Sequence, residues 1–135
     1  MADADAPDPT RAEAPRSSPF CAAAEANVEA IRPLGGLVAR GQVPPDELTD
    51  TVDAVRRAGA DMVNTAPPEI QADVEQTVAV LDLQLDVLIA NDGDPSAVAR
   101  DPQVAARVNS PEVTGATQRV RSYVERTCGP STTPR

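Results

Sequence analysis

The positions of the only two cysteines constrain this chain more than any other feature of its sequence. Cys21 stands at the start of the first helical pattern, and Cys128 stands at the end of the last one, directly before Gly129. This placement predicts one disulfide that joins the first and last helices. Because disulfides persist in oxidising compartments, the pairing also predicts an extracellular or cell-envelope protein. Two free thiols would instead indicate a cytoplasmic protein.

The apolar residues between the cysteines recur every three or four positions, and no segment alternates as a strand does. This spacing predicts an all-α fold, in which residues 20–129 form a four-helix up-down bundle. The first helix is expected to kink or break at Pro33 and Gly35-Gly36. The third helix has a wide apolar surface, which predicts that it contacts more than one neighbour.

Prolines and acidic residues mark the helix boundaries. Proline suits the first position of a helix, and acids that follow it oppose the positive end of the helix dipole. Such starts at residues 44–47 and 67–69 precede the second and third helices, and Asn91-Asp92-Gly93 predicts the end of the third. Three pairs of an N-cap and a proline predict one or two short helical turns and then the last helix: Asp94-Pro95, Asp101-Pro102 and Ser110-Pro111.

The two ends of the chain lie outside this helical pattern. Residues 1–19 contain four prolines among Ala, Asp, Arg and Ser, with no apolar periodicity, and residues 130–135 are similar. We therefore predict two disordered tails that flank the helical domain. The first residues form no apolar run, so we expect an exported form to have lost its signal peptide.

Charge and hydropathy exclude several partners. The net charge is −9, whereas a nucleic-acid or anionic-membrane partner requires a basic surface. No segment has the roughly 18 uninterrupted apolar residues of a transmembrane helix. We expect a monomer that binds no nucleic acid and has no transmembrane segment.

The composition also argues against catalysis. Histidine and lysine are both absent, which removes the commonest general base, a frequent metal ligand and the amine of Schiff-base chemistry. A disulfide would occupy both thiols. We therefore predict a non-enzymatic protein without a metal, a cofactor or catalytic residues.

Four groups of polar residues have both a functional and a plainer structural interpretation. On the third helix, Glu75, Asp82 and Asp86 form an acidic stripe with Gln71, which is either a cation site or a solvated helix face. The run Asn91-Asp92-Gly93-Asp94 is either a fragment of a calcium loop or a helix end followed by an N-cap. In both cases we favour the structural interpretation.

The other two groups lie near the C-terminus. Tyr123 is either a haem ligand or a ring at the edge of the core. Arg119 and Arg121 form either an anion site or exposed ion pairs with neighbouring acids. Here too we favour the structural interpretation.

Three short motifs stand out: Phe20-Cys21-Ala22-Ala23, Ala66-Pro67-Pro68-Glu69-Ile70 and Tyr123-Val124-Glu125-Arg126-Thr127-Cys128-Gly129. Over residues 20–129 the chain resembles a family of uncharacterised small secreted helical proteins and lipoproteins of high-G+C Gram-positive bacteria. The resemblance implies an exported helical domain on a flexible tether, with one disulfide and no established activity. A second resemblance is to small secreted haem-binding helical proteins that also end in Cys-Gly.

Two functional hypotheses follow. The first is a non-enzymatic exported module of the cell envelope or extracellular space that interacts with a protein or a cell-wall component. The alternative is a carrier of a small hydrophobic ligand in an interhelical pocket, with haem as a minor option. The sequence identifies no ligand-binding residues.

Overall fold

The computed structural model describes residues 18–41 and 43–129. These residues form six α-helices and a final π-helical turn, with no strand among them, which confirms the all-α prediction. The elements are α2 (Pro19–Ala39), α3 (Pro45–Thr65), α4 (Gln71–Ala90), α5 (Pro95–Arg100), α6 (Pro102–Val108), α7 (Pro111–Tyr123) and η1 (Val124–Cys128). Most of the predicted tails, residues 1–17 and 130–135, lie outside the described residues.

Proline begins five of the six α-helices, as the sequence predicts for four of them. Before α5, α6 and α7, the side chains of Asp94, Asp101 and Ser110 accept backbone hydrogen bonds from the first turn. The predicted short helical turns before the last helix are therefore α5 and α6. The first helix begins at Pro19, with Ser18 as its N-cap, so residues 18 and 19 do not belong to a disordered tail.

The first helix does not break at Pro33, so the predicted break is absent. α2 runs unbroken to Ala39, although Pro33 lies inside it and removes one backbone hydrogen bond. Leu34 and Leu37 are buried directly after the proline, at 8 % and 7 % exposure. We attribute the continuity to this packing, which is lost if the chain turns away at Pro33.

The third helix begins later than its proline signal predicts. α4 starts at Gln71, because a residue that precedes a proline is pushed toward extended backbone. Ala66 has ψ 134° before Pro67, and Ile70 donates its N–H to the Pro67 carbonyl over 3.1 Å to close a turn. The buried side chain of Ile70 then anchors the start of the helix in the core.

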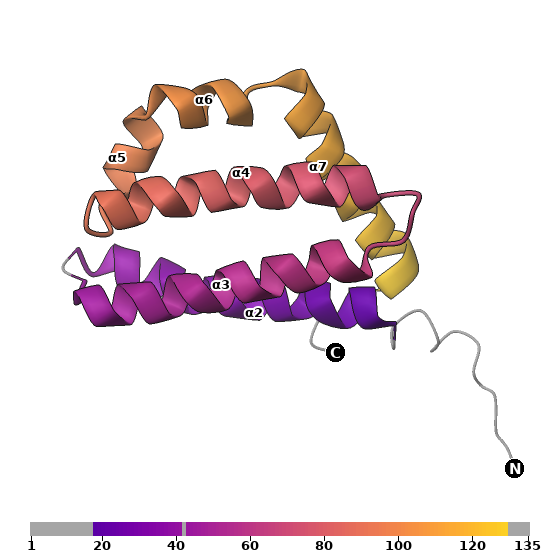
Figure 1. Cartoon of the computed structure of the whole chain (residues 1–135), viewed down its shortest axis with the longest axis horizontal. Helices are drawn as coiled ribbons and strands as arrows, with labels where there is room; N and C mark the ends of the chain where they lie inside the picture. Colours follow the sequence, from indigo (N-terminus) through magenta and orange to yellow (C-terminus); the bar gives the residue numbers. More distant parts are fainter. Residues whose placement is uncertain (1–17, 42, 130–135) are drawn as a thin grey trace, which may run out of the picture.

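Figure 1 shows α2, α3 and α4 running antiparallel to their neighbours, with α5 and α6 arching over α4. α7 crosses one end of α4 at an angle and does not lie along the whole length of α4. The four-helix up-down bundle is therefore not confirmed, although the described residues have an all-α fold. The prediction that the third helix has several neighbours is confirmed, since α4 contacts α3, α5, α6 and α7.

Two clusters of buried side chains hold the helices together. The first core cluster lies toward the start of α2 and contains Phe20, Ala23, Ala24, Met62, Ile70, Val74, Val78 and Val120. The second core cluster lies toward the other end of the long helices and contains Leu34, Leu48, Val52, Val55, Leu85 and Leu88. α7 contributes to the first cluster only, whereas the second cluster joins α2, α3 and α4.

Candidate functional site

The predicted disulfide is present and joins the start of α2 to the end of η1. The Cα atoms of Cys21 and Cys128 are 5.5 Å apart, which is within the usual range for a disulfide. Both residues are buried, at 6 % and 4 % exposure. The bond closes a loop with a sequence separation of 107 residues, so it restrains most of the helical chain.

A groove of about 450 Å³ lies between α2, α4 and α7. Its floor is one face of α4, formed at the helical spacing i, i+3, i+4 and i+7 by Thr77, Val80, Leu81 and Gln84. Asn27 and Ile31 of α2 form one wall. The opposite wall comes from Val108 at the end of α6 and from five residues of α7: Val113, Thr114, Thr117, Gln118 and Arg121.

The groove exists because its two walls pack against different partners. α2 packs mainly against α3, whereas α7 packs mainly against α4. The C-terminal segment meets α2 through η1, where Cys128 bonds Cys21. The disulfide therefore holds the walls together at one end, and they separate toward the other end over the face of α4.

The lining is largely apolar, and some of its apolar side chains are exposed at the rim. Val80 and Val113 are buried, at 6 % and 7 % exposure, whereas Ile31 and Val108 are exposed by 36 % and 40 %. Such exposure is unfavourable for large apolar side chains in water. The rim therefore offers apolar surface that a bound molecule would cover.

Two hydrogen-bond donors of the lining have no protein partner. The Nδ2 of Asn27 is buried and makes no hydrogen bond. Arg121 enters no hydrogen bond or ion pair within the part of the chain that the structure describes. A buried donor without an acceptor costs about 1–3 kcal/mol. The exposed guanidinium of Arg121 is the donor that can bind an acceptor in the groove.

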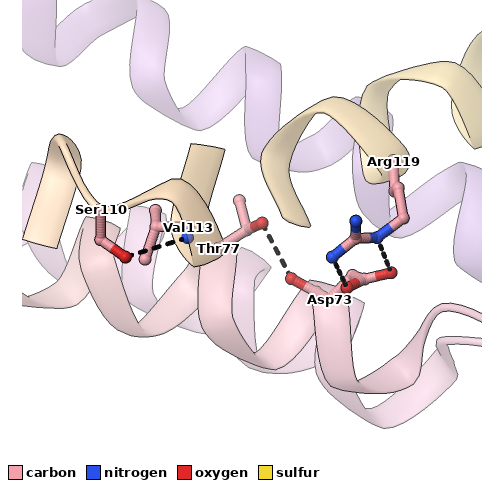
Figure 2. A network of polar contacts seen from close by, with 5 residues as sticks. All are labelled: Asp73, Thr77, Ser110, Val113 and Arg119. Carbon is pink, nitrogen blue, oxygen red and sulfur yellow. Dashed lines mark hydrogen bonds and ion pairs between the residues drawn. The ribbon is translucent and has the colours of Figure 1, made fainter. Parts of the chain in front are cut away.

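The two arginines that the sequence paired as an anion site are separated by the fold. Arg119 donates from Nε and a terminal nitrogen to the two carboxylate oxygens of Asp73, over 3.0 and 2.9 Å (Figure 2). Asp73 thereby raises the pKa of Arg119 above its ordinary value. The structure therefore confirms ion pairing for Arg119, whereas Arg121 faces the groove two positions along the same helix.

The ion pair is one of several polar contacts between and within α4 and α7. Figure 2 shows Thr77 beside Asp73 on α4, where the Thr77 hydroxyl donates to the Asp73 carbonyl oxygen over 2.9 Å. Ser110 caps the start of α7 by accepting the backbone N–H of Val113. Of these contacts, the pair of Arg119 and Asp73 joins α7 to α4, whereas the other two stabilise the individual helices.

Two carboxylates of the acidic stripe of α4 form ion pairs with an arginine of α3. Arg56 of α3 lies 2.6 Å from a carboxylate oxygen of Asp86 and 3.7 Å from one of Asp82. Burial raises the pKa of Asp82, while the positive charge of Arg56 opposes the rise. The pairing links α3 to α4, and Glu75 remains exposed as the structural interpretation predicts.

The run from Asn91 to Asp94 ends one helix and begins the next, as the structural interpretation holds. Gly93 donates its N–H to the Leu88 carbonyl over 2.8 Å, with Asp92 and Gly93 both at positive φ. The side chain of Asp94 accepts from both the hydroxyl and the backbone N–H of Ser96, which lowers the pKa of Asp94. Among the described residues, no three His, Cys, Asp or Glu side chains gather as they would around a metal ion.

Tyr123 packs in the core at the disulfide end. Its ring meets Phe20 edge to face, with centroids 5.8 Å apart, and the guanidinium of Arg126 lies 5.9 Å from the Tyr123 centroid. Tyr123 is partly buried against the first core cluster and does not line the groove. The structural interpretation of Tyr123 is therefore confirmed.

Comparison with protein-family models, curated proteins and solved structures found no match to this chain. The resemblance to secreted proteins of high-G+C bacteria therefore stays a prediction. Residues 18–41 and 43–129 include no helix with the length and apolar character needed to cross a membrane.

Apart from Arg121, which it considered as part of a possible anion site, the sequence interpretation missed the groove residues. The lining mixes Asn, Thr and Gln with Val and Leu on faces that continue the core. The wide apolar surface of the third helix was the one signal that pointed toward the groove floor. The angles at which the neighbouring helices cross α4 decide which part of that surface stays uncovered. Local residue spacing does not encode these crossing angles.

Proposed function

We propose that this protein is an exported, non-enzymatic binding domain, and that the groove between α2, α4 and α7 is its binding site. The observation that carries the proposal is the groove itself, with its volume of about 450 Å³ and its largely apolar lining. Small-molecule sites have volumes of roughly 300–1,000 Å³ and combine an apolar lining with a few polar groups. The groove fits a carrier of a small hydrophobic ligand.

The chemistry of the lining supports binding without catalysis. The groove is lined by Val, Leu, Ile, Thr, Asn, Gln and one Arg, with no carboxylate, thiol or amine. General acid–base or nucleophilic catalysis needs a titratable group or an activated nucleophile close to the substrate. The haem alternative gains no support either, because none of the lining side chains is a usual ligand of haem iron.

The disulfide supports the proposed export. Cys21 and Cys128 are bonded across almost the whole helical domain, and such bonds persist outside the reducing cytosol. An extracellular or cell-envelope location agrees with this bond. We expect the domain to work as a monomer.

A protein or cell-wall component is the second candidate for the occupant. Val28 and Ile31 of α2 are exposed by 47 % and 36 %, and Val108 on the opposite rim is exposed by 40 %. These side chains would extend the apolar surface that a larger partner could contact. The small ligand is favoured because the lining residues converge on a concave site of limited volume.

Binding of a neutral apolar dye, N-phenyl-1-naphthylamine, tests the proposed site. We expect one dye molecule to bind each protein with increased fluorescence. Thr117→Trp and Gln84→Trp place a large ring in the groove from two different helices, and each should abolish the binding. Ala60→Trp adds the same side chain to an exposed position of α3 and should leave it unchanged.

Circular dichroism and the Tm of each variant show whether it remains folded. If the folded Thr117→Trp and Gln84→Trp variants bind the dye as the unsubstituted protein does, the groove is not the site. Absence of dye binding to the unsubstituted protein would contradict the carrier function and favour the larger partner.

A further inference from the structure

The charge distribution around the groove indicates which class of ligand it takes. We propose that the ligand is a small amphipathic oxyanion, with a carboxylate-like head bound by Arg121 and an apolar body lying on the floor of α4. The inference rests on the proposed binding function and specifies its substrate class.

The groove carries a local positive charge in a strongly acidic protein. The chain has 21 acidic residues and a net charge of −9, yet no Asp or Glu lines the groove, whereas Arg121 does. The acids of α4 that flank the floor are paired elsewhere, Asp73 with Arg119 and Asp82 with Arg56. The only formal charge in the lining is therefore positive, which favours an anion.

The unbonded polar groups of the groove point to the same kind of head. Arg121 offers the donors of a guanidinium, and the buried Nδ2 of Asn27 is a second donor without an acceptor. A planar guanidinium bonds carboxylate and phosphate oxygens through two parallel hydrogen bonds. An oxyanion in the groove would give the guanidinium of Arg121 the partner that it does not find among the described residues.

The charged group lies toward one end of the site. Asn27 and Arg121 are the lining residues of α2 and α7 nearest in sequence to Cys21 and Cys128, so they lie toward the disulfide end. Val113 and Val108 lie toward the other end of the α7 wall. Val113 and Arg121 are eight positions apart, which corresponds to about 12 Å of helix. An elongated molecule with one charged end matches this arrangement.

The experiment measures binding of decanoate, decan-1-ol and decyltrimethylammonium, which share an alkyl chain and differ in the charge of the head. Calorimetry and displacement of the neutral dye both report the affinity. We expect decanoate to bind most tightly. Arg121→Gln should weaken decanoate binding about 10-fold, the loss expected for one charge-assisted hydrogen bond, and leave decan-1-ol binding unchanged.

Arg57→Gln is the matched control, because it removes one positive charge from an exposed position of α3 outside the groove. It should not change decanoate binding. Decan-1-ol or decyltrimethylammonium binding as tightly as decanoate would overturn the inference, as would an Arg121→Gln variant with full affinity for decanoate. Because the neutral dye does not need Arg121, these outcomes leave the proposed function intact. That function fails if the unsubstituted protein does not bind the dye, or if the groove-filling tryptophans do not affect the binding.

Discussion

Cys21 and Cys128, whose Cα atoms lie 5.5 Å apart, join the two walls of the groove at one end. α2 and α7 pack mainly on different helices, so the bond and the contacts of η1 set how closely the walls approach. The core around this bond is made mostly of small aliphatic side chains, with Phe20 and Tyr123 as its aromatic members. The disulfide therefore supports both the stability of the domain and the shape of its candidate site.

Reduction of the disulfide should lower the Tm by at least about 10 °C while most of the helical signal remains at low temperature. The chain-entropy treatment assigns about 4–5 kcal/mol to a loop of this length, because the bond restricts the unfolded chain. Thermal circular dichroism with and without reductant measures the effect. A Tm that does not change on reduction would contradict the structural role of the bond.

The double variant Cys21→Ser/Cys128→Ser separates the loss of the bond from any effect of the reductant. It should reproduce the lower Tm of the reduced protein. Dye binding should also weaken, because the wall of α2 is then held to η1 only by side-chain packing. Unchanged dye affinity in the folded double variant would show that packing alone maintains the groove.

Gly59 of α3 allows a close approach of α4. A Cβ at this position would lie 3.1 Å from the Cγ1 of buried Val78, closer than side chains normally pack. Gly59→Ala should therefore destabilise the protein by about 1–3 kcal/mol, although alanine favours a helix. Gly35→Ala is the control, because nothing lies within 4 Å of its added Cβ, and it should stabilise α2 by about 0.5–1 kcal/mol.

Urea unfolding of both glycine variants measures these changes in the free energy of unfolding. The double variant Gly59→Ala/Val78→Ala tests the cause, since removing the Val78 methyl groups relieves the crowding. The loss of unfolding free energy in the double variant should be smaller than the sum of the losses in the two single variants. If Gly59→Ala stabilises the protein as Gly35→Ala does, α3 and α4 have room to separate at little cost.

The helix boundaries could be predicted from the sequence because capping is local. Each proline and its N-cap act within about four residues, as the contacts of Asp94, Asp101 and Ser110 show. The disulfide could also be predicted, since only one intramolecular pairing exists for two cysteines. The same local rules wrongly allowed a break at Pro33, where burial of Leu34 and Leu37 accompanies an unbroken helix.

The candidate site could not be predicted in the same way. Arg119 and Arg121 look alike in the sequence, and only the position of Asp73 on another helix distinguishes them. Asn27 likewise reads as an ordinary surface residue of an amphipathic helix. These roles depend on side chains that are distant in the sequence, and no periodicity within one helix contains that information.

Arg119 and Arg121 should therefore respond differently to the same substitution. Arg119→Gln should lower the Tm, because it removes a bidentate ion pair between α7 and α4. Arg121→Gln should leave the Tm nearly unchanged, since Arg121 bonds none of the residues that the structure describes. Thermal unfolding at low and high salt measures both, and the Arg119 effect should diminish with salt. Equal effects of the two substitutions would contradict this division of roles.

Asp82 should make the protein less stable as the pH rises. Burial raises its pKa above the ordinary value of 3.8, with Arg56 opposing the rise. The folded state thus binds the Asp82 proton more tightly than the unfolded state does. This contribution to stability is fully present below pH 3.8 and is lost as the pH rises through the folded-state pKa.

Asp82→Asn removes the titration while Asp86 keeps its contact with Arg56, at 2.6 Å. The Tm of the unsubstituted protein minus that of Asp82→Asn should therefore decrease from about pH 3 to about pH 6. Asp53→Asn, at an exposed position of α3, controls for the change in net charge. If the difference instead increases with pH, attraction to Arg56 outweighs burial at Asp82. The carboxylate would then stabilise the contact between α3 and α4 in its charged form.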